Sequence, residues 1–277
     1  MLSKLLKQEF RATGRIMLPV FGALLILSVL ANFSIRLLDS SAGNNTVLRI
    51  LAVLVLVFFG AAIFGALIVT LWLMVTRFYR NLLKDEGYLM HTLPVSVHGL
   101  VWSKLIVSLV WFLATGLLIM LIVFLTALIQ SGTNISEILA QLPSWAEVRE
   151  MLASQGIRSG DITLFCAEFI ALVLVGSIAS SLHFYAAMSM GHMFSKDKIL
   201  LSIVFFVALS FVMSLLTNLL GFRLHDLATL TVENGDVAML LFYMRRLLLF
   251  SLGVELLQGA LLYFATTLSL RRGLNLA

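Results

Sequence analysis

Residues 50–76 read ILAVLVLVFFGAAIFGALIVTLWLMVT, an apolar run without one charged side chain. Because a helix needs about 20 mostly apolar residues to cross a bilayer, this run predicts a membrane-spanning helix. The whole chain shares the character, since 61% of its 277 residues are hydrophobic and its mean hydropathy is +1.05. We therefore expect an all-α integral membrane protein with one six-span domain over residues 1–277, the other spans lying at 17–38, 100–129, 162–190, 198–220 and 247–270.

The segment before the first span predicts an amphipathic helix over residues 1–15. Apolar side chains at 2, 5, 6 and 10 share one helical face, and basic side chains fall largely on the other, as in helices that lie along a membrane surface. Gly14 and Pro19 then predict a bend into the first span.

Two of the remaining connections are long enough to carry structure of their own. Residues 130–161 show a helical pattern on both sides of Pro143, which predicts an amphipathic cap outside the membrane. Residues 221–246 mix apolar and charged side chains, and we expect short helices there that re-enter the outer leaflet.

The distribution of Lys and Arg predicts the orientation of the chain, because basic loops are retained on the cytoplasmic side. With the N-terminus inside, twelve basic and four acidic residues lie at the inner ends, against seven basic and eight acidic residues at the outer ends. Both termini are therefore expected in the cytoplasm. The net charge of +5 reflects this topology, and nucleic-acid binding is not expected because the basic residues lie at span ends.

Three ionisable residues fall within the predicted spans, where a charge costs about 2.5–3.5 kcal/mol on insertion scales. They are Glu168, His183 and Glu255. One interpretation has the two carboxylates line a vestibule or a proton-sensitive path. The other has each neutral, or bonded to a Ser, Thr or Arg of a neighbouring helix, with His183 simply packed.

A polar row runs down the fifth span at Ser210, Ser214 and Asn218. Small and polar residues at four-residue spacing let helices approach closely in lipid. The row is interpreted as a seam between two copies of the chain or a lining of the path between them; packing within one chain is the alternative.

The segment between the second and third spans, Arg77 to Lys104, reads RFYRNLLKDEGYLMHTLPVSVHGLVWSK and is dense in charge where its flanks are apolar. Aromatic and Leu side chains supply apolar anchors, and charges of both signs surround them, a mixture typical of protein interfaces. Residues 77–99 are therefore expected to form a cytoplasmic docking loop. A basic, solvated loop is the alternative, although it would not account for so many aromatic residues.

The string YRNLLKDEGYLMHTLPVS, together with the length, the six spans and the N-terminal helix, resembles the membrane (permease) subunit of a bacterial type-2 ABC transporter of the exporter-like class. The resemblance implies a pair of permease chains, identical or different, in the cytoplasmic membrane. Separate ATPase subunits would bind ATP and Mg, and the first cytoplasmic loop would dock on them through a coupling helix. Carried over position by position, the docking residues are Arg80, Asn81, Lys84, Asp85, Glu86, Gly87 and Tyr88.

The chain lacks the motifs of other chemistries. No G-x-x-x-x-G-K-[ST] or H-E-x-x-H pattern occurs, and the single Cys166 lies within a span. We expect no catalytic, cofactor or metal site, and an amphipathic substrate such as a peptide, lipid or drug. The alternative is a proton-coupled secondary transporter that uses the intramembrane carboxylates, although no inverted repeat is visible in the sequence.

Overall fold

The computed structural model describes residues 2–40, 45–84, 96–132, 143–194, 196–221 and 237–272. These ranges are all α-helical and contain no strand, as predicted. Six of their helices are long and apolar enough to cross a membrane, which supports a multi-pass membrane protein. Those six are α1 (Leu2–Asp39), α2 (Thr46–Phe78), α4 (Val97–Ser131), α7 (Ser159–Gly191), α8 (Lys198–Gly221) and α10 (Val237–Arg272), and the shorter elements are the π-helical turn η2 (Tyr79–Leu83) and α6 (Trp145–Ser154).

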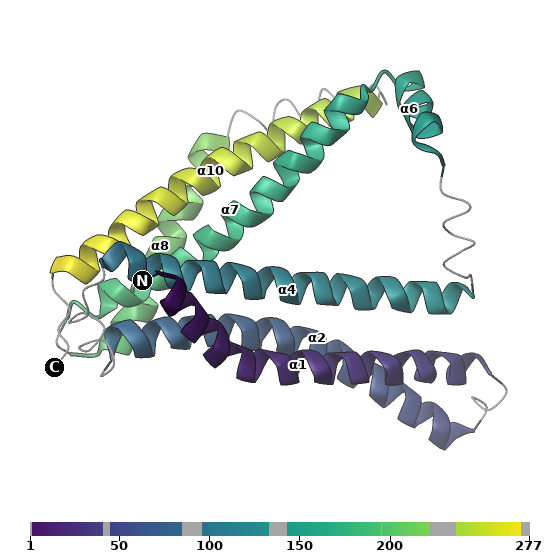
Figure 1. Ribbon diagram of the computed structural model, residues 1–277, viewed down its shortest axis with the longest axis horizontal. Coiled ribbons are helices and arrows are strands. Elements are labelled where there is room, and N and C mark those ends of the chain that lie inside the picture. Colours follow the sequence, from purple (N-terminus) through teal and green to yellow (C-terminus); the bar gives the residue numbers. More distant parts are fainter. Residues whose placement is uncertain are drawn as a thin grey trace. The chain divides into compact units, whose positions relative to one another are not determined.

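The chain divides into two compact units (Figure 1). The first comprises residues 1–77 and 106–142, and therefore contains α1, most of α2 and the larger part of α4. The second comprises residues 78–105 and 143–277, and contains η2, the first turns of α4 and all later helices. Each unit is described separately.

In the first unit, α1 and α4 run in the same direction. Side chains of α1 bond to residues of α4 that follow them by a nearly constant 93 to 98 positions along both helices, which is the signature of a parallel pair. Asn32 donates to Thr126 at 3.1 Å, and Arg36 donates to the carbonyl of Ile129 at 3.2 Å.

Two apolar clusters form the interior of this unit. One surrounds Trp111 of α4, where its indole N–H also donates to Thr13 of α1 at 2.8 Å. The other joins Leu24, Ala66 and Ile122, one residue from each helix. A single hydrogen bond between Thr70 and Thr115, 3.0 Å long and fully buried, adds a polar tie between α2 and α4.

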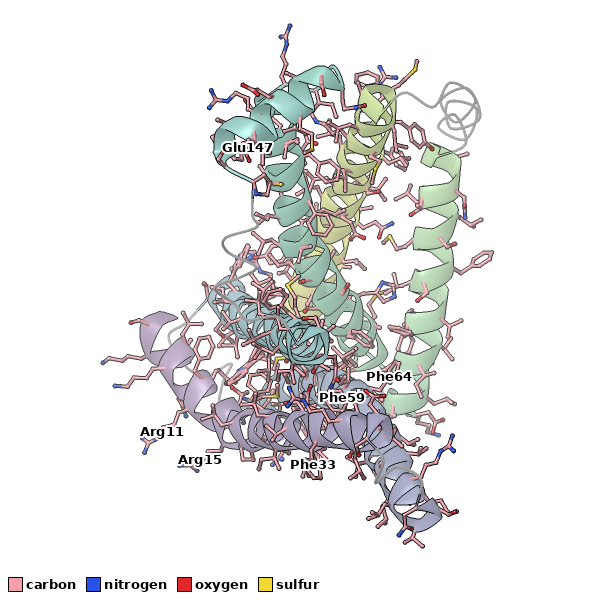
Figure 2. The ribbon with its side chains drawn as sticks, turned by 90° about the vertical axis from the view of Figure 1, so that its right-hand side faces the viewer. Arg11, Arg15, Phe33, Phe59, Phe64 and Glu147 are labelled. Carbon is pink, nitrogen blue, oxygen red and sulfur yellow. The ribbon has the colours of Figure 1, made fainter. Side chains whose placement is uncertain are left out.

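The helix expected over residues 1–15 and the first span form one continuous helix, α1, with Pro19 inside it. Figure 1 shows α1 changing direction near its N-terminal end, so the bend is present without a break. Leu6 and Phe10 pack against the Trp111 cluster, so this face rests on the protein. Arg11 and Arg15 extend away from the helix (Figure 2).

In the second unit, α7 and α10 also run parallel and lie side by side (Figure 1). Arg245 bonds to Glu168 and Gly259 approaches Ala179, pairs separated by 77 and 80 positions. The antiparallel α8 follows α7 closely, because a side-chain Cβ added at Gly191 would lie 2.6 Å from the backbone nitrogen of Ser202. Only glycine allows this approach.

The segments predicted to connect the spans are shorter in the structure, because the helices extend into them. Residues 237–246, expected in the re-entrant segment 221–246, are the first turns of α10, because Arg245 within them is paired with carboxylates and need not leave the helix. The docking loop expected at 77–99 is helical at 77–83 and again from Val97. Residues 85–95, 133–142 and 222–236 lie outside the described ranges.

Part of the segment expected to form the cap, residues 130–161, is helical as α6, while its position outside the membrane stays a prediction. Its first turn carries a capping box, in which Ser144 accepts from the Glu147 backbone N–H and the Glu147 carboxylate accepts from that of Ser144. Reciprocal bonds of this kind satisfy two donors at a helix start. None of the residues of α6 is buried, and its Glu147 is marked in Figure 2.

Large apolar side chains cover the outward faces of the long helices. Phe33, Phe64 and Met120 expose 67%, 70% and 69% of their surface, and Figure 2 shows Phe33 and Phe64 on their helices. Isolated apolar residues on a soluble surface are ordinary, but faces of this kind on helices of spanning length indicate contact with lipid.

We predict that Thr13→Val destabilises the first unit. Valine has nearly the same shape, but it leaves the buried indole N–H of Trp111 without its acceptor, which typically costs about 1–3 kcal/mol. The measurement is thermal unfolding of the purified protein in detergent, read by Trp fluorescence.

Thr76→Val is the matched control. The Thr76 hydroxyl bonds only to carbonyls of its own helix, at 2.7 and 3.2 Å, so its loss should change the unfolding temperature little. Equal effects of the two substitutions would contradict a role for the bond between α1 and α4.

Candidate functional site: a cavity between three helices

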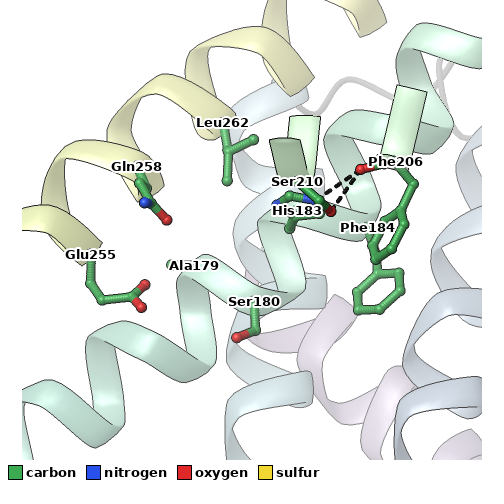
Figure 3. A pocket seen from close by; sticks show the side chains of 9 residues that line it. All are labelled: Ala179, Ser180, His183, Phe184, Phe206, Ser210, Glu255, Gln258 and Leu262. Carbon is green, nitrogen blue, oxygen red and sulfur yellow. Dashed lines mark hydrogen bonds between the residues drawn. The ribbon is translucent and has the colours of Figure 1, made fainter. Parts of the chain in front are cut away.

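The second unit contains an open cavity of ≈ 280 Å³ between α7, α8 and α10. Figure 3 shows Glu255 and Gln258 on α10, and His183 on α7 beside Ser210 of α8. The walls combine polar groups with the aromatic rings and aliphatic chains expected of a ligand pocket. The lining residues are Ala179, Ser180, His183, Phe184, Phe206, Ser210, Glu255, Gln258 and Leu262.

A second, mostly apolar pocket of ≈ 320 Å³ adjoins the first. The two share Ala179 and Glu255 in their linings. Trp102 and Tyr263 supply two aromatic rings, with centroids 6.0 Å apart, and aliphatic side chains of α4, α7 and α10 complete the wall.

His183 is held by α8. Its Nε2 lies 2.9 Å from the Ser210 hydroxyl and 3.4 Å from the carbonyl of Phe206, and the Phe206 ring meets the imidazole edge-on. Ser210 itself donates its only hydrogen to the Phe206 carbonyl at 2.8 Å. The prediction that His183 is packed between neighbours is thus consistent with the geometry.

Gln258 makes an equivalent contact about two helix turns further along α8. Its Nε2 lies 2.9 Å from Thr217 Oγ1 and 3.4 Å from the Met213 carbonyl. Thr217 donates its hydrogen to that same carbonyl at 2.9 Å. The inner face of α8 is therefore the row 206, 210, 213 and 217, a spacing of four, three and four residues that matches helix packing.

Glu255 is half-buried within α10 and makes no hydrogen bond or ion pair with any part of the chain that the structure describes. Its carboxylate is directed toward the space between α10 and α7 (Figure 3). Since charges within a membrane span are costly unless they are paired or wetted, this side chain is the strongest candidate for a functional group in the chain.

Glu168 has a different environment. Arg245 of α10 donates to both of its oxygens, at 2.8 and 3.2 Å, and also to Asp161 at 3.3 Å. A bidentate contact between a guanidinium and a carboxylate is a strong, well-oriented pair. Of the two interpretations of Glu168, the structure favours pairing with an Arg of a neighbouring helix, and the site does not include it.

The three residues of the predicted polar row on α8 do not all face the cavity. Ser210 faces the cavity, whereas Ser214 and Asn218 are exposed and Asn218 bonds back to Ser214 at 2.9 Å. A four-residue step rotates about 40° around a helix of 3.6 residues per turn, so the row leaves the cavity wall. Whether Ser214 and Asn218 meet another chain stays a prediction.

The predicted docking residues are described only in part. Arg80 and Lys84 are exposed on and after η2, whereas Asn81 is buried. Phe78 and Tyr79 at the start of this turn pack against Tyr185 and His192 of the second unit, with ring centroids 4.0 and 5.2 Å apart. The other four predicted docking residues, Asp85, Glu86, Gly87 and Tyr88, lie outside the described ranges.

A further tie joins the start of α4 to the end of α10. Arg271 donates to His98 Nε2 at 2.7 Å, so this nitrogen carries no hydrogen, and His98 Nδ1 donates to the Tyr263 hydroxyl at 2.6 Å. Because Tyr263 lines the apolar pocket, His98, near the end of the predicted docking loop, contacts the pocket wall directly.

The sequence reasoning missed Gln258, Thr217, Trp102 and Tyr263. Gln258 had a signal, since it lies three residues after Glu255 in an apolar run and must share its helical face. No local pattern identifies the others, because they join the site from distant helices. Within the described ranges, no three His, Cys, Asp or Glu side chains are grouped as a metal site requires.

We predict that Arg245→Gln lowers the unfolding temperature, because it leaves the Glu168 carboxylate, which exposes only 13% of its side chain, without its partner. Adding Glu168→Gln should restore part of the loss, since the charge that requires pairing is then gone. The measurement is thermal unfolding of both variants in detergent. A double variant less stable than Arg245→Gln would contradict the pairing.

We also predict a pH-dependent stability from His192. Burial lowers the pKa of this imidazole, an effect increased by the positive charge of Lys198 and partly opposed by the hydrogen bond to Met188. The unfolded chain therefore takes up a proton first as the pH falls. Stability should be complete above about pH 6.5, the ordinary value for histidine, and decline below it.

The measurement is the unfolding temperature between pH 8 and pH 5. His192→Asn keeps a donor to the Met188 carbonyl and cannot titrate, so it should flatten the decline. The matched control, His98→Asn, should leave the contribution of His192 in place. A wild-type profile that His192→Asn does not alter would show the prediction to be wrong.

Comparisons with protein-family models, with curated proteins and with solved structures find no match for this chain. Its membrane-protein character therefore rests on six long apolar helices, and its function has to be inferred from the geometry of the cavity and from the sequence.

Proposed function

We propose that the chain is the permease subunit of an ATP-driven exporter in a bacterial cytoplasmic membrane, with both termini in the cytoplasm. Two such chains would form the membrane path, and separate ATPase subunits would supply the energy. The observation that carries the transport function is the open cavity between α7, α8 and α10, with the carboxylate of Glu255 in its wall.

The cavity supports transport because helices of spanning length surround it. A purely structural bundle gains nothing from an ionisable side chain without a partner at membrane depth, where insertion costs about 2.5–3.5 kcal/mol. A path for a substrate, in contrast, requires polar groups there, since the substrate must exchange its contacts with water for contacts with the protein.

Coupling to an ATPase is supported by the resemblance of residues 77–104 and by two features around them. Arg80 and Lys84, two of the predicted docking residues, are exposed cations. The same region is tied to two helices of the cavity, to α7 through Phe78 and Tyr185 and to α10 through His98 and the pocket residue Tyr263. A force applied to the loop would reach both helices that flank the apolar pocket.

A proton-coupled secondary transporter remains the second candidate, and the free carboxylate of Glu255 is the observation that favours it. Glu168 supports it less, because Arg245 neutralises this carboxylate. The two candidates differ in energy source: only the exporter requires a partner with a nucleotide-binding motif, whereas only the carrier responds to a pH gradient alone.

The test is a search of the neighbouring reading frames for a Walker A motif, then co-expression of the chain with the ATPase so identified, purification, and ATP hydrolysis assays in liposomes. We predict that the two proteins co-purify, and that Arg80→Glu with Lys84→Glu reduces both association and stimulated hydrolysis by about tenfold, as loss of a charged interface contact of about 1.4 kcal/mol would do. Arg149→Glu, on exposed α6, is the charge-matched control and should change neither.

If the double substitution leaves association with the ATPase unchanged, the prediction that Arg80 and Lys84 dock on the ATPase is wrong. Substrate uptake driven by a pH gradient in liposomes that contain this chain alone would instead favour the secondary transporter.

A further inference from the structure

The hydrogen bonds of Ser210 and Thr217 determine which groups around the cavity donate and which accept. Ser210 and Thr217 each have one hydroxyl hydrogen and donate it to a carbonyl four residues earlier. Each hydroxyl must then accept from the side chain that contacts it. His183 is therefore protonated on Nε2, and Gln258 turns its amide N–H groups toward α8.

The second contacts of these two side chains agree with the assignment. His183 Nε2 also lies 3.4 Å from the Phe206 carbonyl, and Gln258 Nε2 lies 3.4 Å from the Met213 carbonyl. A carbonyl oxygen can only accept. The reversed orientation of either side chain would place two acceptors against each other.

What remains for a ligand is a set of acceptors. As a neutral imidazole with its hydrogen on Nε2, His183 offers a lone pair on Nδ1, Gln258 keeps its amide oxygen, and Glu255 keeps both carboxylate oxygens without a partner among the described residues. The Ser180 hydroxyl is the one lining group that can still donate. Neither cavity has a Lys or Arg in its lining, so no fixed cation of the site pairs with the carboxylate.

The adjoining apolar pocket determines the chemical character of the rest of the ligand. It has an apolar wall with the rings of Trp102 and Tyr263, and it meets the acceptor set at Glu255 and Ala179. A molecule that fills both cavities must have an apolar body and a positively charged head that carries N–H donors. An anion would meet an unscreened carboxylate, and a neutral alcohol would leave its charge unbalanced.

We propose that the two cavities form one binding site for a lipophilic primary or secondary ammonium ion, with its N–H groups on Glu255, Gln258 and His183 and its hydrocarbon body beside Trp102 and Tyr263. That this ligand is also the transported substrate rests on the proposed function, whereas its binding does not.

The test is equilibrium binding of tritiated decylammonium to the full chain in nanodiscs, with empty nanodiscs as the background for partition into lipid. Saturable binding is expected at pH 7. Decanol and decanoate, which match the chain length but lack the positive charge, should compete at least tenfold less well. Decyltrimethylammonium, which has the charge without an N–H donor, should also compete less well than decylammonium.

Glu255→Gln keeps the shape of the side chain and removes the charge, so it should weaken decylammonium binding at least tenfold without lowering the unfolding temperature. Glu150→Gln, on exposed α6, is the matched control and should bind as the wild type does. Gly259→Leu extends into the apolar pocket, where an added Cβ would meet only Ala179 at an ordinary 3.8 Å. It should weaken decylammonium more than butylammonium.

Binding that does not saturate above empty nanodiscs, or that Glu255→Gln leaves unchanged, would overturn the proposal. Equal competition by decyltrimethylammonium would overturn the role of Gln258 and His183 as acceptors. Saturable binding without ATP-dependent transport would remove the proposed function and leave the site. ATP-dependent transport without decylammonium binding would remove the site and leave the function.

Discussion

Polar side chains within a bilayer have no bulk water to bond, and this constraint determines how the helices of both units meet. The backbone satisfies itself within each helix, so the side chains must find partners on neighbouring helices or on their own carbonyls. In the first unit Trp111 reaches Thr13 and Asn32 reaches Thr126. In the second unit the hydroxyls of α8 hold His183 and Gln258 in the same manner.

Glu255 departs from this pattern, and the departure gives the cavity its character. The other carboxylate predicted within a span, Glu168, is neutralised by an arginine that the chain supplies from α10. The hydroxyl hydrogens of Ser210 and Thr217 are donated to carbonyls of α8, and no Lys or Arg lines either cavity. A carboxylate without a partner among the described residues, in the wall of a cavity between helices, is more consistent with a ligand site than with a requirement of folding.

The sequence was sufficient to predict the six long helices and the ionisable residues within them, because hydropathy over about 20 residues is a strong signal. The sequence was less informative about where each helix begins and ends. Arg245 and Arg246 appeared to exclude residues 237–246 from a span, but a partner 77 positions away allows Arg245 to remain in α10. Helix α1 also continues through Pro19, and Phe10 on it packs against Trp111, a contact that no local pattern specifies. The cavity combines three helices, and a single sequence does not contain their mutual register.

The close contact of Gly191 with Ser202 makes one end of α8 a fulcrum. At about 1.5 Å per residue, Ser210 lies roughly 12 Å and Thr217 roughly 22 Å along the helix from that point. A small tilt of α8 would therefore displace Thr217 nearly twice as far as Ser210. The hydrogen bond between Gln258 and Thr217 would break first, while the bond between His183 and Ser210 remained. The cavity would therefore widen at the Thr217 end of α8 and keep its wall at the Ser210 end.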